Sequence, residues 1–141
     1  MESLTDLDNK AQQLCIQGLY PEAEVLYRQI VKDKEQKLGT VHPFLIGTLN
    51  KLATVLSELG NYSEAVEFSE RALGIVEQQL GSEHLNYAKQ LGTLGVYLAE
   101  QGNYSGAEDA LSRCHAILEK ILGPEHQDVA NSQLNLAGLL Y

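Results

Sequence analysis

Basic residues and long apolar runs are scarce in this sequence, and each shortage excludes a class of protein. Lys and Arg total 10 against 19 Asp and Glu, so the formal net charge is −9. This charge repels a nucleic-acid backbone or an anionic membrane surface at long range. No stretch approaches the roughly 18 uninterrupted apolar residues of a membrane span, and the N-terminus has no secretory signal pattern. We therefore expect a cytoplasmic protein whose partners are proteins, not nucleic acid or membrane.

Cysteine and proline are also rare. The two cysteines, Cys15 and Cys114, are far apart in the sequence and match neither a disulfide framework nor a metal-binding pair, so we expect two buried thiols. The chain has only three prolines and is 44% apolar, a composition typical of a folded domain. It contains no phosphate-binding loop and no Ser-His-Asp order typical of a hydrolase. We expect no catalysis, no cofactor and no metal site.

The most informative feature that is present is a repeat of 42 residues. Shifting the sequence by 42 residues, twice, aligns identical residues at nine positions of the first 42 residues. In the first copy these positions are Leu7, Leu14, Gly18, Tyr20, Ala23, Glu35, Leu38, Gly39 and His42. A chain of this composition would show about one such threefold identity by chance. The repetition therefore reflects the architecture of the protein.

Each repeat contains two stretches in which apolar residues recur with helical spacing. In the second copy they are Leu49, Leu52, Ala53, Leu56 and Leu59, followed by Ala65, Phe68, Ala72, Ile75 and Val76. Gly60 between the stretches can take the left-handed conformation that ends a helix, and Ser63, like Ser105 in the next copy, can cap the helix that follows. A single hairpin cannot bury its apolar face, so hairpins must stack, with small residues such as Ala53 and Gly95 at the close contacts.

The motif Gly60-Asn61-Tyr62-Ser63-Glu64-Ala65, preceded by Ala53 and followed by Ala72, resembles the tetratricopeptide repeat (TPR) family over nearly the whole chain. The usual period of that family is about 34 residues, whereas HEAT and armadillo repeats have about 40 to 47 but lack the Gly-x-Tyr-x-x-Ala pattern. A Leu-Gly-x-x-His joint at 42-residue spacing is similar to the repeats of kinesin light chains and nephrocystin-3. The resemblance implies an all-α, right-handed superhelical solenoid of antiparallel helix pairs.

We expect one domain, residues 1–141, with three full repeats and part of a fourth. The predicted bounds are about 3–42, 45–84 and 87–126, with the partial repeat at about 128–141. The last repeat lacks a second helix, so the chain is expected to be either an excised piece or an array capped by its last helix, at 129–141. No heptad run lies outside the repeats, so we expect no coiled coil.

The repeated polar residues are predicted to be architectural. His42, His84 and His126 could suggest zinc, but equivalent positions in stacked hairpins lie about 15 to 20 Å apart. We expect each imidazole to bond to backbone groups left unpaired at the joint. Glu35 and its two copies are likewise too far apart to act together, and we expect them on a solvated side of the second helix.

The resemblance implies that a partner peptide lies extended along the first helix of each repeat. The residues predicted to line this groove, after removal of the packing stripe, are Asn9, Gln12, Asn50, Lys51, Thr54, Lys89, Thr93, Val96, Asn131, Leu134 and Asn135. Asparagine can pair with both peptide N–H and C=O groups, and Lys51 and Lys89 favour an acidic ligand. Of the family's carboxylate-clamp positions, here Asp8, Gln12, Lys51, Lys89 and Thr93, only Lys89 fits, so a chaperone-tail clamp is not expected.

We therefore predict a non-catalytic scaffold or adaptor, similar to kinesin light chains, that binds an extended and acidic peptide segment. Two alternatives stay open at this point. The first is self-association through the exposed apolar residues of the last helix, Leu136, Leu139 and Leu140. The second is a role as the regulatory segment of a larger signalling protein.

Overall fold

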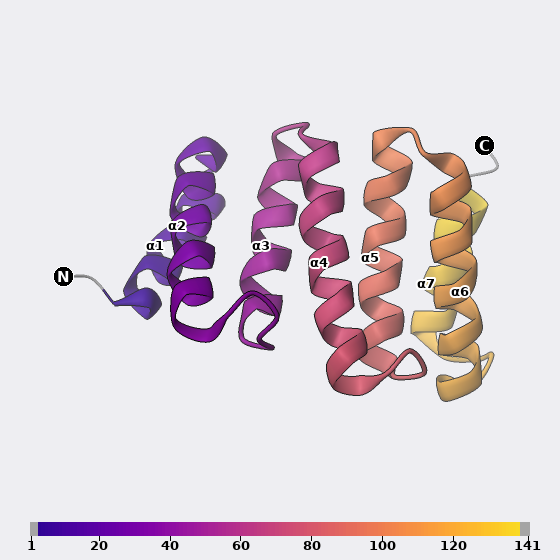
Figure 1. Ribbon diagram of the computed structural model, residues 1–141. Coiled ribbons are helices and arrows are strands. Elements are labelled where there is room, and N and C mark those ends of the chain that lie inside the picture. The colour runs from indigo at the N-terminus through magenta and orange to yellow at the C-terminus, as the bar shows by residue number, and fades with distance from the viewer. Residues whose placement is uncertain (1–2, 139–141) are drawn as a thin grey trace. The chain divides into compact units, whose positions relative to one another are not determined.

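The computed structural model describes residues 3–138, and within that range it contains seven helices and no strand (Figure 1). In chain order they are α1 (Leu4–Ile16), α2 (Tyr20–Leu38), α3 (Leu45–Glu58), α4 (Tyr62–Leu80), α5 (Leu85–Gln101), α6 (Tyr104–Leu122) and α7 (Gln127–Gly138). Each full repeat thus supplies two helices joined by a short turn. The predicted all-α fold is confirmed.

The chain divides into two compact units whose boundary lies inside α4, between Ile75 and Val76. In the first unit α1 packs on α2, and α2 packs on α3. In the second unit α5 packs on α6, and α6 packs on α7. Each unit is therefore a stack of helix pairs with its own core. The single array over residues 1–141 stays a prediction.

Glycine ends the first helix of each pair as predicted, but the serine caps were predicted wrongly. Gly60 and Gly102 have φ angles of 80° and 95°, in the left-handed region that glycine adopts without strain. Helix α6 begins at Tyr104, and its cap is Asn103, whose Oδ1 accepts the amide of Gly106 at 3.0 Å. Asn61 accepts the amide of Glu64 in the same way, at 3.4 Å. Because these carboxamides reach the third amide of the helix, Ser63 and Ser105 lie inside the first turn.

Small side chains lie where neighbouring helices approach most closely. Ala11, Ala23, Ala53, Ala65 and Ala107 are completely buried. At Gly95 a Cβ atom would lie 2.7 Å from both Cγ and Cδ2 of Leu111, closer than packed carbon atoms come. The absence of a side chain at Gly95 therefore sets the distance between α5 and α6, as the sequence pattern predicted.

The repeated histidines bond to backbone amides at the joints, which confirms their predicted structural role. The amides of Phe44, Asn86 and Asp128 donate to Nδ1 of His42, His84 and His126 at 3.1, 3.0 and 3.0 Å. His84 is also the N-cap residue of α5. Since Nδ1 accepts, the ring proton must be on Nε2. Each imidazole thus satisfies one of the amides that a helix start leaves without a partner.

Replacing His84 with alanine is expected to lower the free energy of unfolding by about 1 kcal/mol, the usual cost of losing a helix N-cap. Urea unfolding followed by circular dichroism measures the change. His84→Asn is the matched control, because asparagine keeps an acceptor for the Asn86 amide and should restore most of the loss. Equal stability of His84→Ala and the unaltered chain, or zinc that copurifies with the chain and is lost in His84→Ala, would contradict the structural role.

Gly95→Ala is expected to lower the free energy of unfolding by about 2 kcal/mol, because the added methyl group overpacks the contact with Leu111. Gly74→Ala is the matched control. Gly74 lies inside α4, and a methyl group added there would have no atom within 4 Å, so alanine should stabilise the chain by about 0.5 to 1 kcal/mol. The same urea measurement compares both variants. A stabilising effect of Gly95→Ala would show that the α5–α6 distance is not set at this residue.

Candidate functional site

The residues predicted to line the groove fall into one set in each unit. The first unit holds Asn9 and Gln12 on α1 with Asn50, Lys51 and Thr54 on α3. The second unit holds Lys89, Thr93 and Val96 on α5 with Asn131, Leu134 and Asn135 on α7. In both sets the residues come only from the first helices of their pairs.

The second unit brings five of its six predicted residues around one hollow. This hollow has a volume of about 270 Å³. Lys89, Thr93 and Val96 line it from α5, and Asn131 and Asn135 line it from α7. We call it the α5–α7 hollow. The sixth residue, Leu134, does not line it and is 69% exposed to solvent.

The floor of the α5–α7 hollow comes from residues that the sequence pattern assigned to packing. Cys114 and Leu118 of α6 lie buried beneath Gly92, where a Cβ atom would be only 3.0 Å from the Cys114 Sγ. Burial raises the pKa of the Cys114 thiol, so it stays protonated near neutral pH. The thiol therefore acts as part of an apolar floor, in agreement with the prediction for Cys114. Cys15 was also predicted to be buried, but it is only partly buried.

The polar groups around this hollow are only loosely bound to one another. Lys89 Nζ lies 3.9 Å from an Asp128 carboxylate oxygen, and the Lys89 side chain is 56% exposed. Thr93 Oγ1 donates to the Lys89 carbonyl at 3.2 Å, and Asn131 Oδ1 accepts from Gln127 at 3.1 Å. An ion pair as long as that of Lys89 in solvent contributes little. Lys89 can thus exchange its carboxylate partner at low cost.

The first unit holds a smaller hollow, in which the predicted lysine is already paired. Lys51 and Thr54 line a space of about 240 Å³ together with Cys15, Tyr20, Tyr27, Val55 and Glu58. Lys51 Nζ lies 3.0 and 3.1 Å from the two carboxylate oxygens of Asp8. Gln12 donates to the same carboxylate at 2.6 Å. Asn9, Gln12 and Asn50 do not line the hollow, so less of the predicted set converges here.

A hydrogen-bonded chain between α6 and α7 was not expected from the sequence. His115 Nδ1 lies 2.7 Å from Ser132 Oγ, and His115 Nε2 lies 3.2 Å from a Glu119 oxygen. The i, i+4 spacing of His115 and Glu119 could have predicted the contact between these two side chains, but no sequence signal indicates the contact with Ser132. Ser132 is buried, bonds to the Val129 carbonyl at 2.7 Å and sits inside a helix, where neighbouring amides are committed to the helix. Within the described part of the chain no oxyanion donors lie beside Ser132, so we interpret the hydrogen bonds of His115 with Ser132 and Glu119 as a packing contact between α6 and α7.

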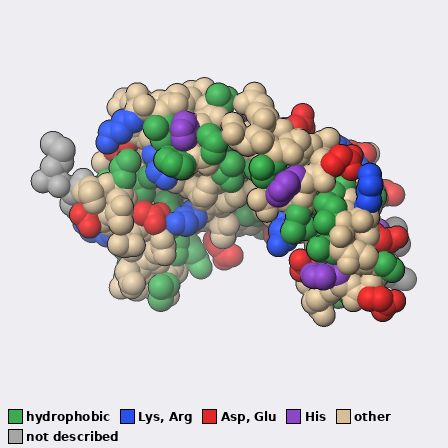
Figure 2. All heavy atoms as spheres, turned by 90° about the horizontal axis from the view of Figure 1, so that it is seen from below, with side chains coloured by type: hydrophobic (Ala, Val, Ile, Leu, Met, Phe, Trp, Pro, Cys, Tyr) green, Lys and Arg blue, Asp and Glu red, His purple; other side chains and the backbone are tan. Residues whose placement is uncertain are grey.

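Charge is mixed across the surface. On the face shown in Figure 2, Lys and Arg side chains are spread among acidic and hydrophobic ones.

Within residues 3–138 no three His, Cys, Asp or Glu side chains gather in a way that could hold a metal ion. None of the helices in that range combines the length and the apolar character that a membrane crossing requires.

Comparison of the sequence with known families identifies the repeat. The profile of the tetratricopeptide repeat family matches residues 3–78, 45–120 and 90–141, which together cover almost the whole chain. The chain belongs to the tetratricopeptide repeat family. TPR domains are in general protein–protein interaction modules. No curated protein sequence matches this TPR chain significantly.

Solved structures support the same subtype of TPR. The TPR-like repeats of a protein assigned as a kinesin light chain from Podosopora anserina are 28% identical, with a TM-score of 0.85 over 96% of this chain and 64% of that chain. BtubC (BKLC) from P. vanneervenii is 25% identical, with a TM-score of 0.79 over 97% of this chain and 54% of its own. The TPR domain of Sgt2 from Aspergillus fumigatus, 18% identical with a TM-score of 0.68 over 99% of this chain and 78% of that chain, shares the fold.

The kinesin-light-chain-like character predicted for the TPR repeats is thereby confirmed. The chain spans less than two thirds of the length of the first of these structures and about half of BtubC.

Proposed function

We propose that this TPR chain is a non-catalytic adaptor that binds an extended, acidic peptide segment along the first helices of its repeats. The observation that carries the proposal is the α5–α7 hollow, where five residues from two helices converge on one space. The sequence pattern alone selects these five residues as groove-lining. The proposal places the adaptor in the cytoplasm, where free thiols such as those of Cys15 and Cys114 stay reduced.

The α5–α7 hollow offers the groups that an extended peptide needs. Asn131 and Asn135 are four residues apart on α7, so their carboxamides lie on the same side of the helix and can each pair with a peptide N–H and C=O. Val96 and Leu118 provide apolar surface for a side chain of the peptide. The hollow therefore suits a backbone held by amides and a single apolar side chain.

Preference for an acidic residue follows from Lys89. Its ammonium group is more than half exposed and only 3.9 Å from Asp128, so a ligand carboxylate can replace Asp128 as its partner. Lys51, by contrast, is held at 3.0 Å by Asp8. We therefore assign the acidic preference mainly to the second unit.

Lys89→Glu is expected to weaken binding of acidic peptides by about fivefold or more, because it replaces attraction by repulsion at the hollow. An array of nine-residue peptides with acetylated N-termini and amidated C-termini identifies binders, and fluorescence anisotropy measures their Kd.

Asn135→Ala should weaken the binding of the same peptides, whatever their charge. Lys120→Glu on α6, the same charge change at a side chain that is 75% exposed and outside the hollow, is the control. If Lys120→Glu weakened binding as much as Lys89→Glu, or neither variant had an effect, the site would be refuted.

Self-association through α7 is the second candidate function, and one observation favours it. Leu134 is 69% exposed, which is unusual for a leucine in the middle of an amphipathic helix. Leu136 is half-buried, while Leu139 and Leu140, also predicted to take part, lie outside the described residues. A copy of this chain could cover Leu134.

Multi-angle light scattering over a concentration series tests self-association. If α7 mediates it, the mean mass of the unaltered chain rises toward twice 15.5 kDa, and Leu134→Asp restores the monomer mass, because a buried carboxylate would have no partner. Val25→Asp, at another exposed apolar side chain, is the control. A constant monomer mass up to the highest concentration would discard this candidate.

A further inference from the structure

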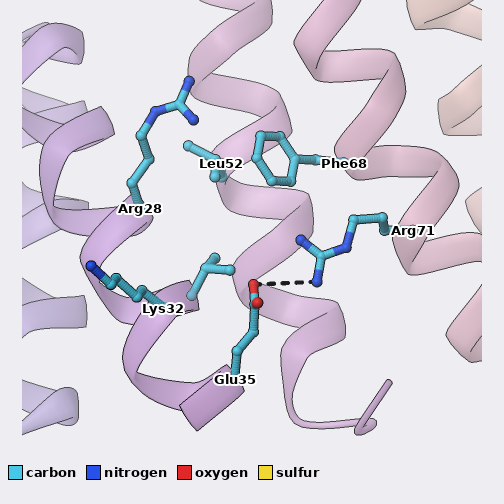
Figure 3. Close-up of a pocket in the computed structure, with 7 residues that line it drawn as sticks. Arg28, Lys32, Glu35, Leu52, Phe68 and Arg71 are labelled. Atoms are coloured by element: carbon cyan, nitrogen blue, oxygen red, sulfur yellow. Dashed lines mark hydrogen bonds and ion pairs between the residues drawn. The ribbon is translucent and has the colours of Figure 1, made fainter. Parts of the chain in front are cut away.

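A different hollow lies on the second helices of the first unit, away from the predicted groove residues. Its volume is about 290 Å³. It is lined by Arg28, Val31, Lys32 and Glu35 of α2, Leu52 of α3, and Phe68 and Arg71 of α4. We call it the α2–α4 pocket. In Figure 3, Arg28 of α2 and Phe68 and Arg71 of α4 lie around Leu52, whereas the Lys32 side chain extends away from Leu52.

The pocket has an apolar floor and an aromatic wall between two guanidinium groups. Leu52 and Val31 are buried and form the floor. The guanidinium carbons of Arg28 and Arg71 lie 5.7 and 5.9 Å from the centre of the Phe68 ring, within range of cation–π attraction. The wall is thus held in place by contacts on both sides of the ring.

The three cationic groups at the pocket differ in how firmly they are bound. Arg28 donates to Glu24 at 2.8 Å and to both oxygens of Glu64 at 2.9 and 2.8 Å, and these bonds hold the pKa of Glu64 below its usual value. Arg71 makes one longer bond, from Nη2 to Glu35 at 3.3 Å. Glu35 was predicted to be solvated, but it is half-buried and faces Arg71. Arg28 is therefore a fixed wall, and Arg71 is only partly engaged.

Lys32 is the least constrained of the three. It is exposed at the rim of the pocket, and no carboxylate or other hydrogen-bonding group within residues 3–138 pairs with its ammonium group. Retaining an unpaired ammonium beside two arginines has an electrostatic cost, which is modest in solvent. The cluster therefore presents one unpaired charge and one weakly bound guanidinium next to an apolar floor.

The residues that distinguish the pocket are not part of the repeat. At the 42-residue offset Arg28 is replaced by Glu70 and Ser112, whereas the architectural glycines and alanines recur. Lys32 is replaced by Gly74 and Ala116, and Phe68 by Ala110. Arg71 recurs as Arg113, so Arg28, Lys32 and Phe68 are the pocket residues that helix stacking alone does not require. Their presence at one junction calls for a role other than packing.

We infer that the α2–α4 pocket binds a carboxylate with an adjoining apolar side chain, presented by an acidic segment of a partner protein. Lys32 at the rim and the Arg71 guanidinium supply positive charge for the carboxylate, and the apolar side chain packs on the partly exposed Phe68 ring above the buried Leu52. The carboxylates of Glu24, Glu35 and Glu64 already pair with the two arginines, Arg28 and Arg71. A dianionic phosphate would face these carboxylates, so a single negative charge suits the pocket better.

This site goes beyond the proposed groove because no residue is shared between the α2–α4 pocket and the α5–α7 hollow. Either site can fail while the other stands. Variants at Lys32 and Arg71 test the pocket, whereas variants at Lys89 and Asn135 test the hollow.

N-acetyl-leucine, which carries one carboxylate and one branched apolar side chain, is a suitable probe for the pocket. In an NMR titration of the whole chain it is expected to shift the Leu52 methyl and Arg71 Nε–Hε signals saturably. N-acetyl-leucinamide, the neutral counterpart, should bind at least about fivefold more weakly, the upper range for an exposed ion pair. Phenyl phosphate is the third probe, and tighter binding of phenyl phosphate would overturn the assignment to a carboxylate.

Variants locate the site. Lys32→Glu and Arg71→Gln are each expected to weaken N-acetyl-leucine by about fivefold or more, and circular dichroism checks that both remain folded. Lys37→Glu makes the same charge change on α2 outside the pocket and should have a small effect. Shifts that do not saturate, equal affinity for acid and amide, or equal weakening by Lys32→Glu and Lys37→Glu would each overturn the proposal.

Discussion

Close approach of neighbouring helices is the constraint on which the rest of this structure depends. Two helices can approach this closely only where one of them carries alanine or glycine, as at Ala11, Ala53 and Gly95. At Gly95 even a methyl group would meet Leu111. Since packed interiors tolerate little change in volume, these positions fix the rotation and spacing of each helix. The faces left uncovered by packing are thereby decided as well, and the α5–α7 hollow and the α2–α4 pocket lie on such faces.

The fold could be predicted from the sequence because its determinants are local and recur. The glycine at the end of each first helix and the histidine at each joint act on backbone groups two or three residues away, so spacing alone reveals them. The caps show where such reasoning fails. Both Asn103 and Ser105 are good capping residues, and the choice between them depends on which one has non-helical backbone where the helix begins, as Asn103 does with φ −86° and ψ 75°.

The candidate site could be predicted only in part, because pattern gives the face of a helix but not the partner of a side chain. The prediction placed Lys89, Thr93 and Asn131 on the surface of first helices, where they do line one hollow. It did not foresee that Asp8 would pair with Lys51, or Asp128 with Lys89. The charges in these pairs do not recur, since Asp8 aligns with Asn50 and Lys89 with Asn131 at the 42-residue offset. The self-alignment that reveals the architecture therefore contains no signal for them. The α2–α4 pocket was missed for the same reason, since Arg28, Lys32 and Phe68 have no equivalents in the other repeats.

Pairing within the chain also determines what kind of ligand these surfaces can take. In a chain of net charge −9 almost every cation near a hollow has a carboxylate within reach, so an acidic ligand gains only the difference between its own ion pair and the one it replaces. That difference is small where the internal pair is short and hydrogen-bonded, as for Lys51 with Asp8 or Arg28 with Glu64. It is larger where the internal pair is long, as for Lys89 with Asp128, or where the described part of the chain offers no partner, as for Lys32. The proposed recognition of acidic segments is thus confined to the few cations whose internal pairing is incomplete, and its expected strength depends on salt because those groups are exposed.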